Sequence, residues 1–176
     1  FLLDQLDQVI FPDWVNISEQ PLIPRGTGSA PFDSEGVATH NRELVKDGRL
    51  ISYVLDSYSG RKLGMPSTGN AGGVRNLKIE TGNLDLQGLC KEMQQGLLVT
   101  EMMGQGLNSV TGDYSRGAAG FWVENGDIQF PVAEITIAGN MKTMFQQLLA
   151  VGNDLDHPGS TRTGSWLIES MTIAGS

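Results

Sequence analysis

The sequence predicts an α+β fold that is mostly antiparallel β-sheet with hairpins and two or three packing helices. Two dipeptides, Asp47-Gly48 and Asn125-Gly126, tolerate positive φ at both central positions of a type I′ turn, and each lies between apolar runs. Glycine supplies 23 of the 176 residues, well above the usual ~7%, which favours many turns. Expected strands therefore outnumber expected helices.

The first elements are expected to be a helix, a short strand and a long loop. Residues 1–11 carry apolar side chains at helical spacing, and Pro12 ends the segment. A short strand is expected at 14–17. Residues 18–36 contain three prolines and three glycines and read as a loop that ends in PFDSEG.

A hairpin is expected next, with arms at 39–46 and 49–56 around the Asp47-Gly48 turn. Residues 57–63 predict a helical turn, and the glycine-rich run 67–73 predicts a flexible stretch. A strand at 74–80 then leads into a helix.

That helix has clear start and stop signals. Asp85 is the expected N-cap and Gly96 the expected stop, and the apolar stripe between them consists of Leu86, Leu89, Cys90 and Met93. The following run, 97–102, predicts a buried strand.

The central stretch, 111–140, predicts the best-defined hairpin of the chain. A two-residue turn at Asn125-Gly126 places Val123 opposite Ile128; it also places Phe121 opposite Phe130 and Trp122 opposite Gln129. After the turn, Pro131 and a shift in apolar phase between Val132 and Ile135 predict a bulge or a strand break.

The chain is expected to close with a helix, a polar loop and a strand. Asn140 is the expected N-cap of the helix and Gly152 its stop, and the apolar stripe is Met141, Met144, Phe145, Leu148 and Leu149. Residues 153–164 predict the loop, and 166–173 predict a strand that joins a sheet.

Size and charge limit the possible functions. A length of 176 residues suits a single domain, 1–176. The net charge of −8 and the pI of about 4.6 argue against nucleic acid and anionic membrane as partners. One cysteine fits a reducing compartment. The chain starts at Phe1 without an initiator Met, so we expect it to be the later part of a longer protein.

Catalytic motifs are not evident. His40 and His157 are the only histidines and are not spaced as zinc-peptidase ligands, so solvated surface positions are expected. Cys90 on a helical apolar stripe is expected to be a buried structural thiol. The sequence contains neither a G-x-S-x-G nucleophile turn nor a complete phosphate-binding glycine motif.

Two pairs of charged residues remain as candidates for a catalytic or peptide-binding role. Asp33 and Glu35 suit either an acid/base pair or turn carboxylates that accept backbone N–H bonds. Asp113 and Arg116 can hold a peptide backbone or terminus through charge-assisted bonds, or can form a plain ion pair with each other.

Several segments resemble the TldD/PmbA (TldE) metalloprotease family, specifically the C-terminal region of its PmbA/TldE branch. The resemblance extends over the whole chain and is carried by TGDYSRGAAGFWVENGDIQFPVAEITIAGN, PFDSEG, KDGRL followed by SYSGRKLG, STGNAGG and VTEMMGQG. It implies a cytoplasmic heterodimer of TldD and TldE that processes unfolded peptides, and an association with modulation of DNA gyrase.

The resemblance implies that zinc belongs to a TldD-like partner. In TldD, an H-E-x-x-x-H helix and a C-terminal Cys hold the metal, whereas the matching segment 161–164 of this chain has no Cys. No metal or other cofactor is therefore expected here. This region is expected to form part of the cavity wall and the partner interface, with Asp33, Glu35, Asp113 and Arg116 as candidate substrate- or partner-contacting residues.

Two other functions stay open. Residues outside this sequence can supply zinc ligands and make the whole chain a metalloprotease in its own right. The domain can also be a peptide-binding scaffold without protease activity. The partner is either a TldD-like subunit or a second copy of this chain.

Overall fold

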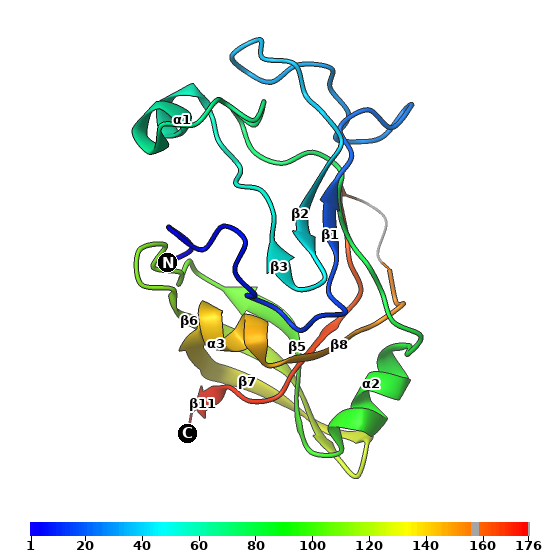
Figure 1. Cartoon of the computed structure of the whole chain (residues 1–176). Helices are drawn as coiled ribbons and strands as arrows, with labels where there is room; N and C mark the ends of the chain where they lie inside the picture. Colours follow the sequence, from blue (N-terminus) through cyan, green and yellow to red (C-terminus); the bar gives the residue numbers. More distant parts are fainter. Residues whose placement is uncertain (156–158, 176) are drawn as a thin grey trace. The chain divides into compact units, whose positions relative to one another are not determined.

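The computed structural model describes residues 1–155 and 159–175, and Figure 1 traces the chain. Backbone contacts divide it into two compact units. The N-terminal unit comprises Leu2–Glu80 and Leu155–Gly164, and the C-terminal unit comprises Thr81–Asp154 and Ser165–Ser176 together with Phe1. Both are built mainly on antiparallel sheet, and the described residues form three short helices, which confirms the α+β class. The single-domain assignment stays a prediction.

The N-terminal unit contains a five-stranded sheet in the order β3-β2-β1-β4-β9, in which only the β4–β9 pair is parallel. Val45, Leu50 and Ile79 share one face of this sheet and are at most 6% exposed, and Leu44 on the opposite face of β2 is 8% exposed, so both faces are covered in part. The strands are β1 (Ile17–Glu19), β2 (Arg42–Lys46), β3 (Arg49–Leu50), β4 (Leu77–Ile79) and β9 (Thr161–Arg162).

The predicted helix at 1–11 is wrong. Asp4 and Asp7 adopt left-handed φ of 60° and 61°, which a right-handed helix does not accommodate, and Val9 forms an isolated bridge with Arg49. The segment is a series of turns beside the Asp47-Gly48 turn, where the amides of Ile10 and Phe11 donate to the Gly48 carbonyl at 2.9 and 3.0 Å.

The turn at Asp47-Gly48 forms as predicted, with φ of 47° and 73°. The pairing of Val45 with Leu50 is also as expected, but the second arm ends at Leu50 instead of continuing to 56. The predicted helical turn is α1 (Ser57–Leu63), whose N-cap Asp56 accepts a bond from the Ser59 amide at 2.7 Å.

The C-terminal unit contains a four-stranded sheet in the order β11-β7-β6-β5 and a two-stranded sheet, β10-β8. Ala118, Ile135 and Ile137 form the centre of its core, at most 7% exposed. The strands are β5 (Gly96–Met103), β6 (Asp113–Glu124), β7 (Asp127–Asn140), β8 (Leu148–Val151), β10 (Trp166–Ile168) and β11 (Thr172–Ala174).

The central hairpin forms at Asn125-Gly126, but only part of its predicted register holds. Val123 pairs with Ile128 as expected. A register shift at the next step then pairs Trp122 with Phe130 and leaves Gln129 unmatched, so the predicted Phe121–Phe130 and Trp122–Gln129 pairs are wrong.

The disturbance predicted after Pro131 is a bulge within a continuous β7. Gly120 pairs with Val132 and Ala118 pairs with Ile135, so two β7 residues face one residue of β6. One of the two, Glu134, has a φ of 55°. The bulge thus requires a backbone conformation that residues with a Cβ atom rarely adopt.

The two predicted helices of this unit form but are shorter than expected. The side chain of Asp85 caps α2 (Leu86–Met93), which ends at Gln94 with φ of 60° instead of at Gly96. Asn140 caps α3 (Met141–Gln146). The second half of the predicted α3 stripe is strand β8, which pairs with β10.

Two strand predictions for this unit also need correction. The 97–102 segment is strand β5, but it lies at a sheet edge, and its residues from Thr100 to Met103 are exposed instead of buried. The predicted 166–173 strand is two strands, β10 and β11, in different sheets. In the described part of the chain no helix has the length and apolarity needed to cross a membrane.

Candidate functional site

A groove of about 380 Å³ lies in the C-terminal unit where the loop after β5 meets the start of β6. Leu107 and Tyr114 form an isolated bridge, and the side-chain oxygen of Asn108 accepts bonds from the amides of Val110 and Thr111. These bonds fold the loop back on β6. The lining residues are Gln105, Gly106, Leu107, Asn108, Asp113, Tyr114 and Ser115.

Gly106 permits the close approach that forms this groove. A Cβ at this position would lie 1.6 Å from the Ser115 carbonyl oxygen, far inside van der Waals contact. The Ser115 amide donates to the Gly106 carbonyl at 2.8 Å. The glycine of the VTEMMGQG segment therefore allows the loop and β6 to bond directly.

Asp113 presents an anchored carboxylate in the groove. One oxygen accepts the Thr111 hydroxyl at 2.7 Å and the other accepts the Asn140 side-chain amide at 3.0 Å. The hydrogen bonds from Thr111 and then Asn140 lower the pKa of Asp113 below its usual value. The groove thus holds a charged acceptor, oriented for a cationic or N–H-bearing ligand.

Arg116 does not form the ion pair with Asp113 that was one of its alternatives. Residues three apart on a strand point to opposite faces, so the two side chains diverge along β6. Arg116 instead donates from Nη2 to the Met102 carbonyl at 3.3 Å, which ties β6 to the edge strand β5.

Asp33 and Glu35 lie in the N-terminal unit and act on loop structure. Asp33 is 4% exposed, and its Oδ1 accepts the amides of Glu35 and Val37, while Oδ2 accepts the Ala71 amide, all at 2.9 Å. This geometry matches the turn-carboxylate alternative. Glu35 is exposed and accepts the Ser57 amide at the start of α1 at 2.9 Å.

Burial raises the pKa of Asp33, but the amides of Ala71, Val37 and Glu35 and the charge of Arg75 together lower it by more, so that the pKa lies below its usual value. A depressed pKa means that the folded state binds this proton less well than the unfolded state does. The stabilisation from Asp33 is therefore present above the unfolded-state pKa near ~4 and is lost as pH falls through the lower folded-state pKa.

We expect Asp33→Asn to reduce the decrease in the free energy of unfolding that accompanies a fall in pH. The variant should be less stable than the parent chain at pH 6, and the difference should shrink at pH 3. Urea unfolding at the two pH values measures both differences. Asp13→Asn, at an exposed position, is the control. A constant difference between parent and Asp33→Asn across the two pH values would contradict the expectation.

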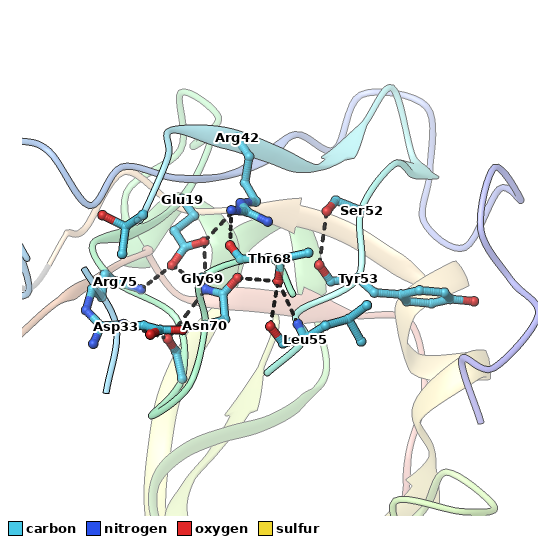
Figure 2. A network of polar contacts seen from close by, with 12 residues as sticks. Glu19, Asp33, Arg42, Ser52, Tyr53, Leu55, Thr68, Gly69, Asn70 and Arg75 are labelled. Atoms are coloured by element: carbon cyan, nitrogen blue, oxygen red, sulfur yellow. Dashed lines mark hydrogen bonds and ion pairs between the residues drawn. The ribbon is translucent and has the colours of Figure 1, made fainter. Parts of the chain in front are cut away.

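A buried polar network lies close to Asp33, and sequence analysis did not identify it (Figure 2). Its centre is Glu19, a carboxylate only 1% exposed. Glu19 accepts the Asn70 side-chain amide at 2.8 Å and the Arg75 amide at 2.8 Å, and Arg42 Nε lies 3.5 Å from its Oε2. Arg42 also donates to the Thr68 carbonyl.

The network continues from Asn70 to Thr68, whose hydroxyl donates to the Asn70 side-chain oxygen at 2.7 Å. The same hydroxyl accepts the Leu55 amide at 2.7 Å. The glycine-rich loop 67–73 is therefore held from both sides by buried groups, instead of being the flexible stretch expected from its composition.

A second concave surface, of about 600 Å³, lies on the sheet of the N-terminal unit. Its rim carries Glu43, Lys78 and Glu80, all exposed. Glu43 forms an ion pair with Lys46 at 3.2 Å. Because one face of an antiparallel sheet ordinarily meets water, this surface needs no ligand to account for it.

Metal ligands are not clustered within residues 1–155 and 159–175, where no three His, Cys, Asp or Glu residues are arranged to hold an ion. His40 is exposed, as expected, and His157 lies outside the described residues. Cys90 is 4% exposed, and burial raises the pKa of its thiol, as suits a structural cysteine.

Known proteins similar to this chain share one family. The family model described as the PmbA/TldA metallopeptidase C-terminal domain matches residues 1–175. A curated relative from Escherichia coli O157:H7, Metalloprotease PmbA, is 55% identical over 175 residues, which are 99% of this chain and 39% of the relative. The chain thus spans about two fifths of the length of this relative.

Solved structures show the same fold. A Bacteroides thetaiotaomicron protein described as a modulator of DNA gyrase is 36% identical with a TM-score of 0.91, covering 100% of this chain and 40% of that one. TldE from Thermococcus kodakarensis is 25% identical with a TM-score of 0.79, covering 99% of this chain and 42% of that one. The chain belongs to the PmbA/TldA metallopeptidase family, and its residues correspond to the C-terminal domain of that family.

Proposed function

We propose that this chain is the C-terminal part of a TldE-type component that works with a TldD-type subunit in processing unfolded peptides in the cytoplasm. The match of residues 1–175 to the metallopeptidase C-terminal domain is the observation that carries the proposal. The similarity to TldE from Thermococcus kodakarensis supports the TldE side of the pair. In this proposal the domain is non-catalytic and contributes to the cavity wall and the partner interface.

The donor set of the described residues does not fit a zinc site. The segment at which the resemblance places the zinc-binding Cys of TldD contains Thr161 and Thr163 instead. A neutral hydroxyl is a poor zinc ligand compared with a thiolate. We therefore assign zinc to the TldD-type partner and derive no catalytic step from this chain.

The groove and the neighbouring edge of β5 suit contact with an extended peptide. Asp113 offers oxygens to a peptide ammonium or backbone N–H, since each oxygen accepts only one bond within the described chain. From Thr100 to Met103, β5 is exposed and pairs only with β6 among the described residues. Backbone pairing at such an edge is independent of side-chain sequence, as processing of varied peptides requires.

The test is peptidase turnover with full-length chains. The TldE-type chain and a TldD-type chain from the same organism should each show little turnover of an unstructured peptide alone and marked turnover when mixed. Asp113→Asn in the complex should raise KM for such peptides severalfold, because shape is kept and charge is lost. The melting temperature should fall slightly, since an Asn side chain cannot accept from both Thr111 and Asn140. Asp13→Asn, on an exposed loop, is the control.

Two results would contradict the proposal. Full turnover by the TldE-type chain alone would make it a peptidase in its own right. Peptide binding without any gain of turnover on mixing would favour the alternative, a peptide-binding scaffold without protease activity. An unchanged KM for Asp113→Asn would exclude only the groove as the contact site.

A further inference from the structure

The outer half of the β6–β7 hairpin exposes large apolar side chains on a rigid support. Phe121, Ile128 and Phe130 are 36%, 51% and 55% exposed. The tip is tied to α2, because the Gly126 amide donates to the Gln94 carbonyl at 2.9 Å. Val123 is fully buried beside these exposed residues. Because Phe130 pairs with Trp122 and Ile128 pairs with Val123, Phe130 lies on the face of the hairpin opposite to Phe121 and Ile128. A large aromatic side chain exposed on a fixed hairpin suits an anchor at a protein interface.

Glu134 lies in the bulge of β7, at the end of the 121–134 segment, and its backbone conformation is disfavoured. Five of the eight non-glycine residues with positive φ are Asp or Asn, which tolerate it, and Glu134 is the one that lies inside a strand. Its side chain is exposed and makes no hydrogen bond or ion pair with the described residues. Glycine would fit the bulge better, so local folding does not explain the glutamate.

The charge of the hairpin indicates the chemistry of its partner. Residues 121–134 contain the carboxylates Glu124, Asp127 and Glu134 and no Lys or Arg. In a symmetric contact between two copies, this surface would face itself and bring like charges together. A partner that presents cationic groups is complementary to it.

We propose that the outer hairpin, residues 121–134, docks a folded protein partner that receives Phe130 in an apolar pocket and places a Lys or Arg opposite Glu134. The inference rests on the proposed function, in which that partner is the TldD-type subunit. Apolar anchors give such an interface its affinity, and the charged residue at the margin gives orientation and speeds association.

The test compares charge reversals in the full-length TldE-type chain by calorimetric titration with the TldD-type subunit. Glu134→Lys and Phe130→Ser should each weaken binding by about tenfold or more. Glu80→Lys is the matched control, since Glu80 is also exposed at the end of a strand but lies in the N-terminal unit. It should change the Kd less than about twofold, as expected for a charge that is not part of the proposed contact.

A second variant at position 134 distinguishes the effect of the strained backbone from the effect of the side-chain contact with the partner. Glu134→Gly relieves the left-handed backbone, so it should raise the melting temperature of the free chain while it weakens binding by several-fold. Wild-type affinity in both Glu134 variants and in Phe130→Ser, within a complex that still forms, would overturn the docking inference alone. Absence of any complex with the wild-type chain would instead overturn the proposed function and, with it, the partner named here.

Discussion

Replacing Gly120 by alanine is expected to destabilise the protein by about 3 kcal/mol, at the upper end of the cost of overpacking a core. Gly120 is buried in β6 beside the bulge. A Cβ there would lie 1.9 Å from the Leu98 carbonyl oxygen and 3.0 Å from the Val99 Cα. Both atoms belong to backbone, so no side chain can rotate away, and β5 would have to separate from β6.

Gly117→Ala is the matched control on the same strand. Its Cβ would meet the Met103 side chain at 3.5 Å, an ordinary contact. The free energy of unfolding should change by less than about 1 kcal/mol, since removing a glycine also restricts the unfolded chain. Urea unfolding of both variants checks the pair. Equal stabilities for Gly120→Ala and Gly117→Ala would show that the β5–β6 approach at Gly120 is not as close as described.

Truncating Glu19 to alanine is expected to cost about 3–5 kcal/mol, the usual penalty when one partner of a buried ion pair is removed. The change leaves the Arg42 guanidinium, with a side chain 16% exposed, without its carboxylate. It also removes the acceptor for the Asn70 side chain and the Arg75 amide. The loop 67–73 would lose one of the contacts that fix it, whereas those of Thr68 with Leu55 and of Ala71 with Asp33 would remain.

A double-mutant cycle distinguishes the cost of leaving the Arg42 charge unpaired from the cost of the space that the Glu19 side chain leaves empty. Glu19→Leu should be nearly as harmful as Glu19→Ala, because the Arg42 charge stays buried. Adding Arg42→Met should recover much of the loss, since apolar replacements of both partners leave neither charge unpaired. Denaturant unfolding of the four chains gives the coupling energy. Additive losses in the double variant would contradict the account of Glu19 and Arg42 as one unit.

Local signals in the sequence predicted the turns and helix starts. Asn125-Gly126 and Asp47-Gly48 specify their turns because positive φ is a property of the dipeptide itself. Asp85 and Asn140 were identified as N-caps for the same reason, since a cap bonds residues two or three positions away. Such signals need no knowledge of the rest of the chain.

Features that depend on distant segments were missed. The leucines of residues 1–11 have helical spacing, but the segment lies against the turn of β2 and β3 instead of forming a helix. Leu148 and Leu149 continue the apolar pattern of α3, but pairing with β10 makes them strand. Tertiary pairing therefore outweighed local propensity in both segments.

The residues of the candidate site also divide into those that a local motif indicates and those that depend on distant segments. Asp113 and Arg116 were selected from a motif, but the alternation of side chains along β6 makes them point apart. Glu19 carried no signal at all, because its partner Asn70 lies 51 residues away. A single buried glutamate on a three-residue strand cannot be distinguished in sequence from an exposed one.

Zinc content measured on the intact full-length proteins tests the central claim most directly. If this chain belongs to the non-catalytic component, the purified TldE-type chain should contain substantially less than one zinc per chain. The complex with the TldD-type subunit should contain one zinc, lost when the TldD-type metal ligands are changed. Stoichiometric zinc on the TldE-type chain alone, together with peptidase turnover that a chelator abolishes, would contradict the account.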